Sequence, residues 1–286
     1  MNAPFGSGLL DRFEEFADGL NHPEGVAWSP PEGCVYAGGE GGEVYRVSLD
    51  GEVEEVGSTG GSLLGIALDG RGRVYACDAD RGEIARLDPS TGAVETYARG
   101  VGGEELDTPN VAAFDAAGNL YVTCSGEDDR PEIVCIGPDR VTERWSTSVP
   151  GYPNGCLVTP DGSALVVVEA HAERVVRVPI LPDGSAGAPT VVAELPDTDA
   201  DGIALDAEGS LWVTLYRPDG LVRIRADGSV ERAIDDHLAT TFDAPTNIAW
   251  VGERLDLVVV ANVGGRFLSI GDLGLAGQPL HYPEVP

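Results

Sequence analysis

The chain has 286 residues, which is enough for one or two domains with a large buried core. Its formal net charge of −30 argues against nucleic acid and anionic membranes as partners, because both select basic surfaces, and it is typical of a solvated exterior. All 18 basic residues are arginines, so Schiff-base chemistry and a lysine general base are excluded.

The cysteines and the N-terminal sequence indicate a protein of a reducing compartment. The five cysteines contain no CxxC pair and several lie in apolar runs, so we expect buried free thiols: Cys34, Cys77, Cys124, Cys135 and Cys156. No basic region followed by a long apolar run opens the chain, and no apolar stretch approaches the ~20 residues that span a bilayer. These features predict a soluble, cytoplasmic protein.

The first twenty residues contain the best candidate for a helix. Leu9, Leu10, Phe13 and Phe16 have a spacing that predicts one short helix, in an N-terminal extension over residues 1–15. The segment 16–20 is expected to pair with the last repeat of the chain instead. Beyond it, short β-rich runs are separated by DG, GG and PDG turns, which is typical of an all-β fold.

Six copies of one pattern fill the rest of the chain. Each copy has a turn, a short apolar run, a polar turn with glycine, a second apolar run, a third run and a more variable fourth. The copies begin HPEGVAW, SLLGIAL, TPNVAAF, YPNGCLV, DADGIAL and PTNIAWV, and their equivalent positions recur after 40, 46, 44, 47 and 45 residues. Four strands per ~40–50 residues are typical of a propeller blade. The sequence therefore predicts an all-β, six-bladed β-propeller in a single domain, residues 1–286.

One position of the repeat has an oxygen-bearing side chain in five of the six copies. The innermost strand of each blade lines the channel of a propeller, so the equivalent residues are expected to face one another: Glu24, Leu64, Asn110, Asn154, Asp201 and Thr246. Taken singly, Asn-Gly and Asp-Gly are ordinary turn dipeptides. Burying four oxygen-bearing side chains at the same position of the repeat would cost free energy of desolvation unless a cation compensated for it. Glu24, Asn110, Asn154 and Asp201 therefore predict a central site for one divalent cation. Ca²⁺ suits these ligands best, and Mn²⁺, Mg²⁺ and Zn²⁺ remain open.

A second group of residues follows each second strand and is expected on the same face as Glu24. These loops contain Glu40, Asp78, residues 124–129, Glu169 with His171, Tyr216 with Arg217, and Asn262. They predict the wall of a pocket above the cation. His171 and Tyr216 are the best candidates for substrate contacts there, together with Asn110 and Thr246 of the ring. No GxSxG elbow, P-loop or HExxH spacing offers other chemistry.

The segments HPEGVAW, TPNVAAFDAAGNLYVT, YPNGCLVTPDGSALVVVEA and DADGIALDAEGSLWVT resemble the gluconolactonase/regucalcin (senescence marker protein) family, with luciferin-regenerating enzymes as relatives. The likeness extends over residues 16–284. It implies that Glu24, Asn154 and Asp201 bind a divalent metal and that Asn110 lies beside it and contacts substrate. It also implies lactone hydrolysis, with the metal as Lewis acid and Asp201 as ligand and base.

The chain departs from the sugar-lactone members of that family near Asn110. Thr108 and Val111 stand where those members typically carry an arginine and an aspartate. A less polar lactone or ester, or a tailoring step in a small-molecule pathway, is therefore favoured. An isomerase or cyclase that uses the same metal, and a non-catalytic ligand-binding propeller, remain alternatives.

Overall fold

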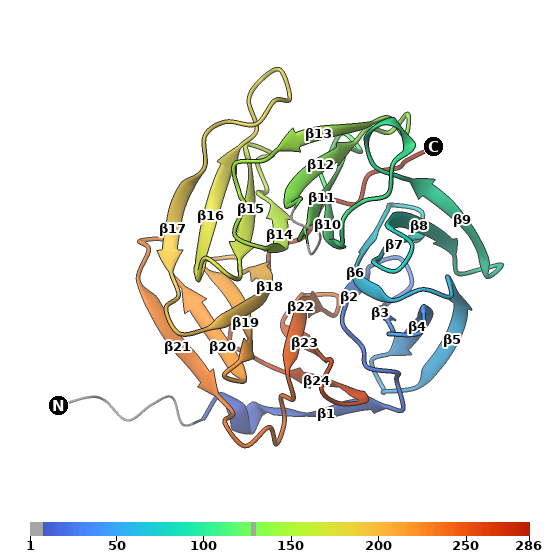
Figure 1. The fold of residues 1–286 in the computed structure, drawn as a ribbon. Helices are drawn as coiled ribbons and strands as arrows, with labels where there is room; N and C mark the ends of the chain where they lie inside the picture. Colours follow the sequence, from blue (N-terminus) through green and yellow to red (C-terminus); the bar gives the residue numbers. More distant parts are fainter. Residues whose placement is uncertain (1–7, 127–129) are drawn as a thin grey trace.

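In the computed structural model, which describes residues 8–126 and 130–286, six four-stranded antiparallel sheets surround a common centre (Figure 1). Blade 1 contains β2 (Val26–Ser29), β3 (Cys34–Gly38), β4 (Glu43–Ser48) and β5 (Val53–Ser58), and blade 2 contains β6 (Leu63–Leu68), β7 (Val74–Asp78), β8 (Glu83–Asp88) and β9 (Ala93–Ala98). Blade 3 contains β10 (Pro109–Phe114), β11 (Leu120–Cys124), β12 (Glu132–Ile136) and β13 (Thr142–Ser146), and blade 4 contains β14 (Pro153–Val158), β15 (Ala164–Glu169), β16 (Arg174–Pro179) and β17 (Thr190–Glu194). Blade 5 contains β18 (Asp199–Leu205), β19 (Leu211–Arg217), β20 (Gly220–Ile224) and β21 (Val230–Asp235). Blade 6 contains β22 (Pro245–Val251), β23 (Leu257–Asn262), β24 (Phe267–Gly271) and β1 (Phe13–Asp18). The predicted all-β, six-bladed propeller is confirmed.

The two ends of the propeller domain meet in blade 6. Strand β1 is the outermost strand of that sheet and pairs antiparallel with β24, so the prediction that the segment around Phe16 completes the last blade is confirmed. The predicted helix is wrong: Leu10–Arg12 form a short 3₁₀ turn, η1, and Phe13 and Phe16 lie in strand β1; among the residues described from Gly8 onward, no other helical turn precedes β1. Phe13 and Phe16 enter two different core clusters, which an extended strand allows because residues three apart point to opposite faces. Residues 13–15 of the predicted extension thus lie in β1.

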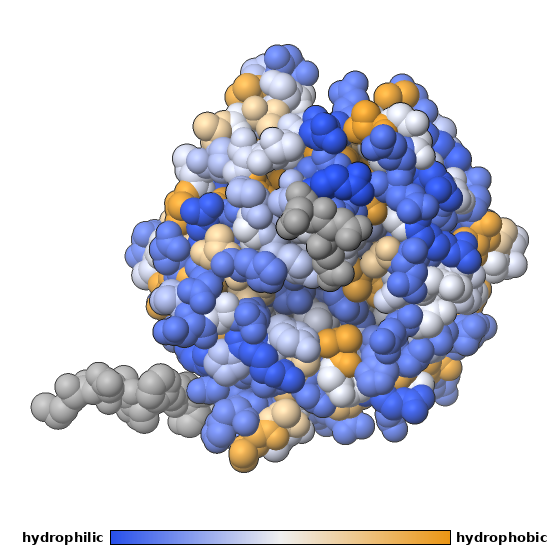
Figure 2. All heavy atoms as spheres, viewed as in Figure 1, coloured by the Kyte–Doolittle hydropathy of each residue, from blue (hydrophilic) through white to orange (hydrophobic). Residues whose placement is uncertain are grey.

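The hydrophobic core is divided among the blade interfaces. Each of six clusters of buried side chains combines residues of two neighbouring blades. The innermost and second strands are therefore covered on both faces, which explains their continuous apolar runs. No helix among the described residues is long and apolar enough to cross a membrane. The face of the molecule in Figure 2 is mostly hydrophilic, as the net charge of −30 requires.

The five cysteines are free thiols, as the sequence predicts. Four are buried and Cys135 is half-buried. Burial raises the pKa of every one of them, to about 11 for Cys34 and about 12 for Cys135 and Cys156. These thiols stay protonated and serve as small apolar core residues.

Neighbouring blades meet around the ring at a glycine or at a threonine hydroxyl. A β-carbon on Gly25 or Gly155 would lie 2.3 Å from the carbonyl oxygen of the next strand, and on Gly65 or Gly202 it would lie 2.5 Å from one. At the other two junctions a hydroxyl donates to a carbonyl, from Thr123 to Asn154 (2.8 Å) and from Thr246 to Glu24 (2.9 Å). Six such contacts close the circle of strands.

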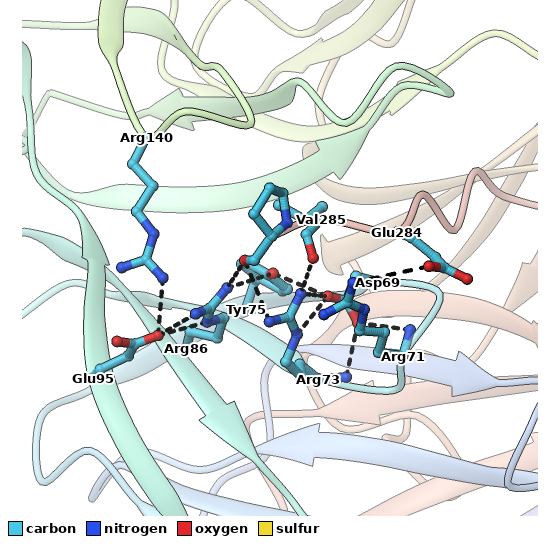
Figure 3. Close-up of polar contacts among 10 residues, drawn as sticks. Asp69, Arg71, Arg73, Tyr75, Arg86, Glu95, Arg140, Glu284 and Val285 are labelled. Atoms are coloured by element: carbon cyan, nitrogen blue, oxygen red, sulfur yellow. Dashed lines mark hydrogen bonds and ion pairs between the residues drawn. The ribbon is translucent and has the colours of Figure 1, made fainter.

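The C-terminal segment returns across blades 2 and 3. The side chain of Val285 is fully buried in the core between these blades. Arg73 and Arg86 donate to the backbone oxygens of Val285 and Pro286, with an Arg86–Pro286 distance of 2.6 Å (Figure 3). The Asp69 carboxylate in turn accepts from Arg73 Nε at 2.7 Å and from a tyrosine hydroxyl. We call residues 272–286 the C-terminal strap.

Substitution of Gly155 by alanine tests the strand junctions. The new β-carbon would meet a backbone carbonyl that no side-chain rotation can relieve. We expect a loss of about 1–3 kcal/mol in the free energy of unfolding, measured in urea. Gly137→Ala is the matched control, because its one close contact is the Asp139 carboxylate, which can rotate. Equal stability of the two variants would contradict the role of Gly155.

Substitution of Val285 by alanine tests the strap. Removing this buried side chain should cost about 2 kcal/mol in the free energy of unfolding, through lost burial and a residual cavity. Val141→Ala is the control, since Val141 is 53% exposed in a loop and should change stability by less than about 0.5 kcal/mol. If the two variants have the same urea midpoint, the strap does not contribute to the stability of the fold.

Candidate active site

Four ring residues are reached through the same unusual backbone step. The residue two positions earlier has a positive φ and is followed by proline: His22 (45°), Thr108 (55°), Tyr152 (60°) and Ala244 (50°). Positive φ is uncommon outside glycine and typically costs about 1–3 kcal/mol. The step directs the chain into the ring at Glu24, Asn110, Asn154 and Thr246.

Each ring residue lies in a bulge of the backbone. In five innermost strands two residues face one residue of the second strand, starting at Leu64, Asn110, Asn154, Asp201 and Thr246. In blade 1, Glu24 N donates to Gly38 O and Gly38 N donates to Gly25 O, so Glu24 and Gly25 also face one residue. Bulges commonly re-aim a side chain next to an active site.

Asp201 interacts with both Asn154 and Glu24. The Asn154 side chain donates to Asp201, and both residues are buried. Burial raises the pKa of Asp201 to about 7 in spite of this hydrogen bond. Burial, followed by the negative charges of Asp201 and Glu40, raises the pKa of the half-buried Glu24 well above its ordinary value. Two carboxylates thus share one poorly solvated space.

The same space fits a hard cation. Asn154 Oδ1 is buried and has no hydrogen-bond partner, which leaves an amide oxygen beside the two carboxylates. Within residues 8–126 and 130–286, no three His, Cys, Asp or Glu side chains are grouped to hold a metal ion. A cation here would therefore need the amide oxygen of Asn154 as well as carboxylate oxygens, a set that Ca²⁺, Mg²⁺ and Mn²⁺ accept.

Asn110 and Thr246 lie in the same ring and are both 2% exposed. Asn110 Nδ2 donates to Ser125 Oγ at 2.8 Å, which in turn donates to Pro153 O at 3.0 Å in the next blade. Thr246 Oγ1 donates its proton to Glu24 O. Both side chains therefore stabilise the backbone of the ring. Asn110 Oδ1 and Thr246 Oγ1 could still accept a hydrogen bond from a ligand or bind a cation.

The predicted wall divides into exposed and buried residues. The pairing of Pro153 with Glu169 and of Asp199 with Arg217 places the loops after the second strands on the ring face. His171 is exposed and stacks on Tyr152, with ring centroids 4.3 Å apart. Tyr216 is 39% exposed, and the Arg217 guanidinium lies 4.8 Å from the centre of its ring. With exposed Glu40, these side chains are accessible at the mouth, and their contact with substrate remains a prediction.

The other residues of the predicted wall are buried and have structural partners. Asp78 pairs with Arg81, Glu169 accepts from Arg174 at 2.6 Å, and Asn262 accepts from Asp243 N and donates to Ser269. Cys124 is buried in the core between blades 2 and 3. Residues 127–129 lie outside the described residues.

Thr123 and Thr214 were missed by the sequence analysis. Thr123 Oγ1 accepts a hydrogen bond from Val111 N and donates one to Asn154 O. Thr214 Oγ1 accepts a hydrogen bond from Gly202 N and donates one to Thr246 O. Both fix the backbone of the ring from the second strand. The matching segments LYVT and LWVT could have revealed them, because a hydroxyl in the middle of a buried run needs partners.

The fold is shared with several solved structures. A gluconolactonase from Xanthomonas campestris superposes with a TM-score of 0.79 at 20% identity, over 91% of this chain and 89% of that one. Regucalcin from Agrobacterium tumefaciens, a calcium-binding protein, has a TM-score of 0.74 at 18% identity over 99% and 98%. A luciferin-regenerating enzyme has a TM-score of 0.77 at 16% identity over 95% and 99%. At these identities the likeness concerns the fold.

Two sequence comparisons address the family. Strictosidine synthase-like protein 6 of Arabidopsis thaliana is 25% identical over 231 residues, which are 72% of this chain and 58% of that protein. The chain thus spans less than two thirds of this relative. The family model described as SMP-30/Gluconolactonase/LRE-like region matches residues 22–263, a range that begins at the positive-φ residue His22 and includes all six ring positions. The chain therefore belongs to the SMP-30/gluconolactonase/LRE-like family.

Proposed function

We propose that the protein is a divalent-cation-dependent hydrolase that opens an uncharged lactone. The observation that carries the proposal is the unpartnered oxygen of buried Asn154 beside two carboxylates whose pKa values are raised. Membership of a gluconolactonase-containing family supports lactone chemistry. Ca²⁺ is the preferred cation, because its flexible coordination suits mixed carboxylate and amide oxygens at about 2.3–2.6 Å.

In this proposal Glu24, Asn154 and Asp201 hold the cation, and Asn110 lies beside it. When bound, the cation supplies Lewis-acid activation of the lactone carbonyl. Asp201 is the base that takes a proton from the attacking water, and the hydrogen bond from Asn154 orients its carboxylate. His171, Tyr216, Asn110 and Thr246 are the proposed substrate contacts.

The charges at the mouth support an uncharged substrate. Each described arginine in or directly beside the loops after the second strands has a partner: Arg81 with Asp78, Arg130 with Asp107, Arg174 with Glu169, Arg217 with Asp219, and Arg266 with the Leu20 carbonyl. Thr108 stands in place of the arginine of sugar-lactone members and makes its own contact with Asp107. An acidic mouth without a free guanidinium disfavours anionic substrates.

A second candidate function uses the same ring for a different reaction. The curated relatives are named for a synthase rather than for a lactonase. A synthase or isomerase would use the cation site without releasing acid from a lactone. A propeller that only binds a ligand is less favoured, because it has no need to bury two carboxylates at its centre.

Substitution of ring residues tests the proposal. Asp201→Asn and Asn154→Ala should each weaken cation binding by at least about 10–100-fold, the loss seen when even an outer-shell partner is removed, as measured calorimetrically with Ca²⁺, Mn²⁺, Mg²⁺ and Zn²⁺. Proton release from a panel of lactones should fall by about 100-fold or more for Asp201→Asn. Asp227→Asn is the control, since Asp227 is an exposed turn residue of the same blade.

The lactone panel, run with and without a chelator, separates the candidates. Chelator-sensitive acid release supports the proposal, and acid release that a chelator leaves unchanged contradicts its metal dependence. A cation that binds while no lactone is opened favours the synthase or isomerase. Absence of cation binding at every metal tested would leave a ligand-binding propeller.

A further inference from the structure

A large cavity lies at the end of the propeller opposite the ring. Its volume is about 780 Å³, and its lining starts one or two residues beyond the ring positions, at Val26, Ile66, Val111, Cys156, Ile203 and Asn247. It continues to the far ends of the innermost strands and to the turns after β2 and β22. None of the six ring residues lines it, so it is separate from the candidate active site.

The C-terminal strap crosses this end of the cavity. Residues 278–282 are part of the lining, and the segment around them is tied to blade after blade. Gln278 N donates to Leu205 O in blade 5 at 2.9 Å, and His281 Nε2 lies 3.1 Å from Thr159 O just after β14 in blade 4. The Tyr282 hydroxyl donates to Trp28 O in blade 1 at 3.0 Å. The strap thus forms a fixed rim, with the side chain of Leu280 53% exposed.

The lining chemistry defines the occupant. Trp28, Phe114 and Trp250 provide aromatic surface, and the strands contribute mainly valine, leucine, isoleucine and alanine side chains. Among the described residues the lining contains no arginine, whereas Glu32 and Glu253 add carboxylates. Asn247 and Gln278 supply amides for a few hydrogen bonds. Such a wall favours an apolar molecule and disfavours an anion.

The size of the cavity suits a small organic ligand, and its rim is open to solvent at the exposed side chains of Leu49 and Leu280. Pockets for small organic ligands measure about 300–1,000 Å³ and combine apolar walls with a few polar groups. We propose that this cavity is a second binding site, for an uncharged, apolar organic molecule of drug-like size. The site does not depend on the proposed lactonase activity.

Titration with N-phenyl-1-naphthylamine, an uncharged apolar dye, tests the site. Energy transfer from Trp28 and Trp250 to the bound dye should give a saturable, one-to-one signal, because both tryptophans line the cavity. The anionic dye 8-anilinonaphthalene-1-sulfonate should bind at least about tenfold more weakly, because Glu32 and Glu253 disfavour anions. Absence of a saturable signal, or equal binding of the two dyes, overturns the proposal.

Variants at the rim locate the dye. Leu280→Asp and Leu49→Asp place a charge at exposed lining positions and should weaken binding about tenfold. Leu238→Asp is the matched control, because Leu238 is 72% exposed and does not line the cavity. Thermal unfolding and circular dichroism check that all three fold. If the rim variants bind as the control does, the proposal is wrong.

A ring variant distinguishes the two sites. Asp201→Asn should bind the dye with unchanged affinity, since Asp201 lies outside the lining. Loss of dye binding in this variant would place the dye at the ring and overturn the separate site. The outcome is independent of whether the protein hydrolyses lactones, because neither substrate nor cation takes part.

Discussion

The structure depends on the close approach of six backbone segments around one axis. Four of the six junctions are possible because a glycine follows the ring residue, and a β-carbon there would lie 2.3–2.5 Å from a neighbouring carbonyl oxygen. The remaining junctions use threonine hydroxyls to join one strand to the next. Because the strands meet so tightly, the side chains of the ring residues converge as well. The blade interfaces around them then bury the apolar runs that supply most of the stability.

This convergence is costly for the residues that occupy the ring. Two carboxylates share a space with little solvent. Burial raises the pKa of both, and the negative charge of Asp201 raises the pKa of Glu24 further. The backbone is also strained before four of the six positions, where residues with positive φ precede proline. Neither feature improves packing. Strain and buried charge that gather at one place point to a functional site rather than to a structural one.

The two ends of the channel have opposite chemistry. The ring face combines carboxylates, amides and paired arginines, whereas the far end has apolar walls and a covering strap. The innermost strands produce both ends, since five of the six ring positions are polar and each strand continues from its ring position as an apolar run. A single repeated strand pattern therefore offers a polar site and an apolar site along one axis. The strap adds a rim that belongs to no blade.

The sequence alone determined the fold and the composition of the ring. A repeat of about 45 residues with a polar residue at one phase was sufficient, because every copy of a propeller strand occupies the same place around the axis. Tertiary contacts decided the rest. Phe13 and Phe16 have the spacing of a helix, yet pairing with β24 makes them a strand whose two faces enter different cores. Likewise Asp78, Glu169 and Asn262 resemble pocket residues in sequence, but the fold buries them, and they pair with Arg81, Arg174 and Ser269 a few residues further along the chain. A local pattern cannot show which polar side chains become buried, because burial depends on neighbouring sheets that pack against them only when the propeller is assembled.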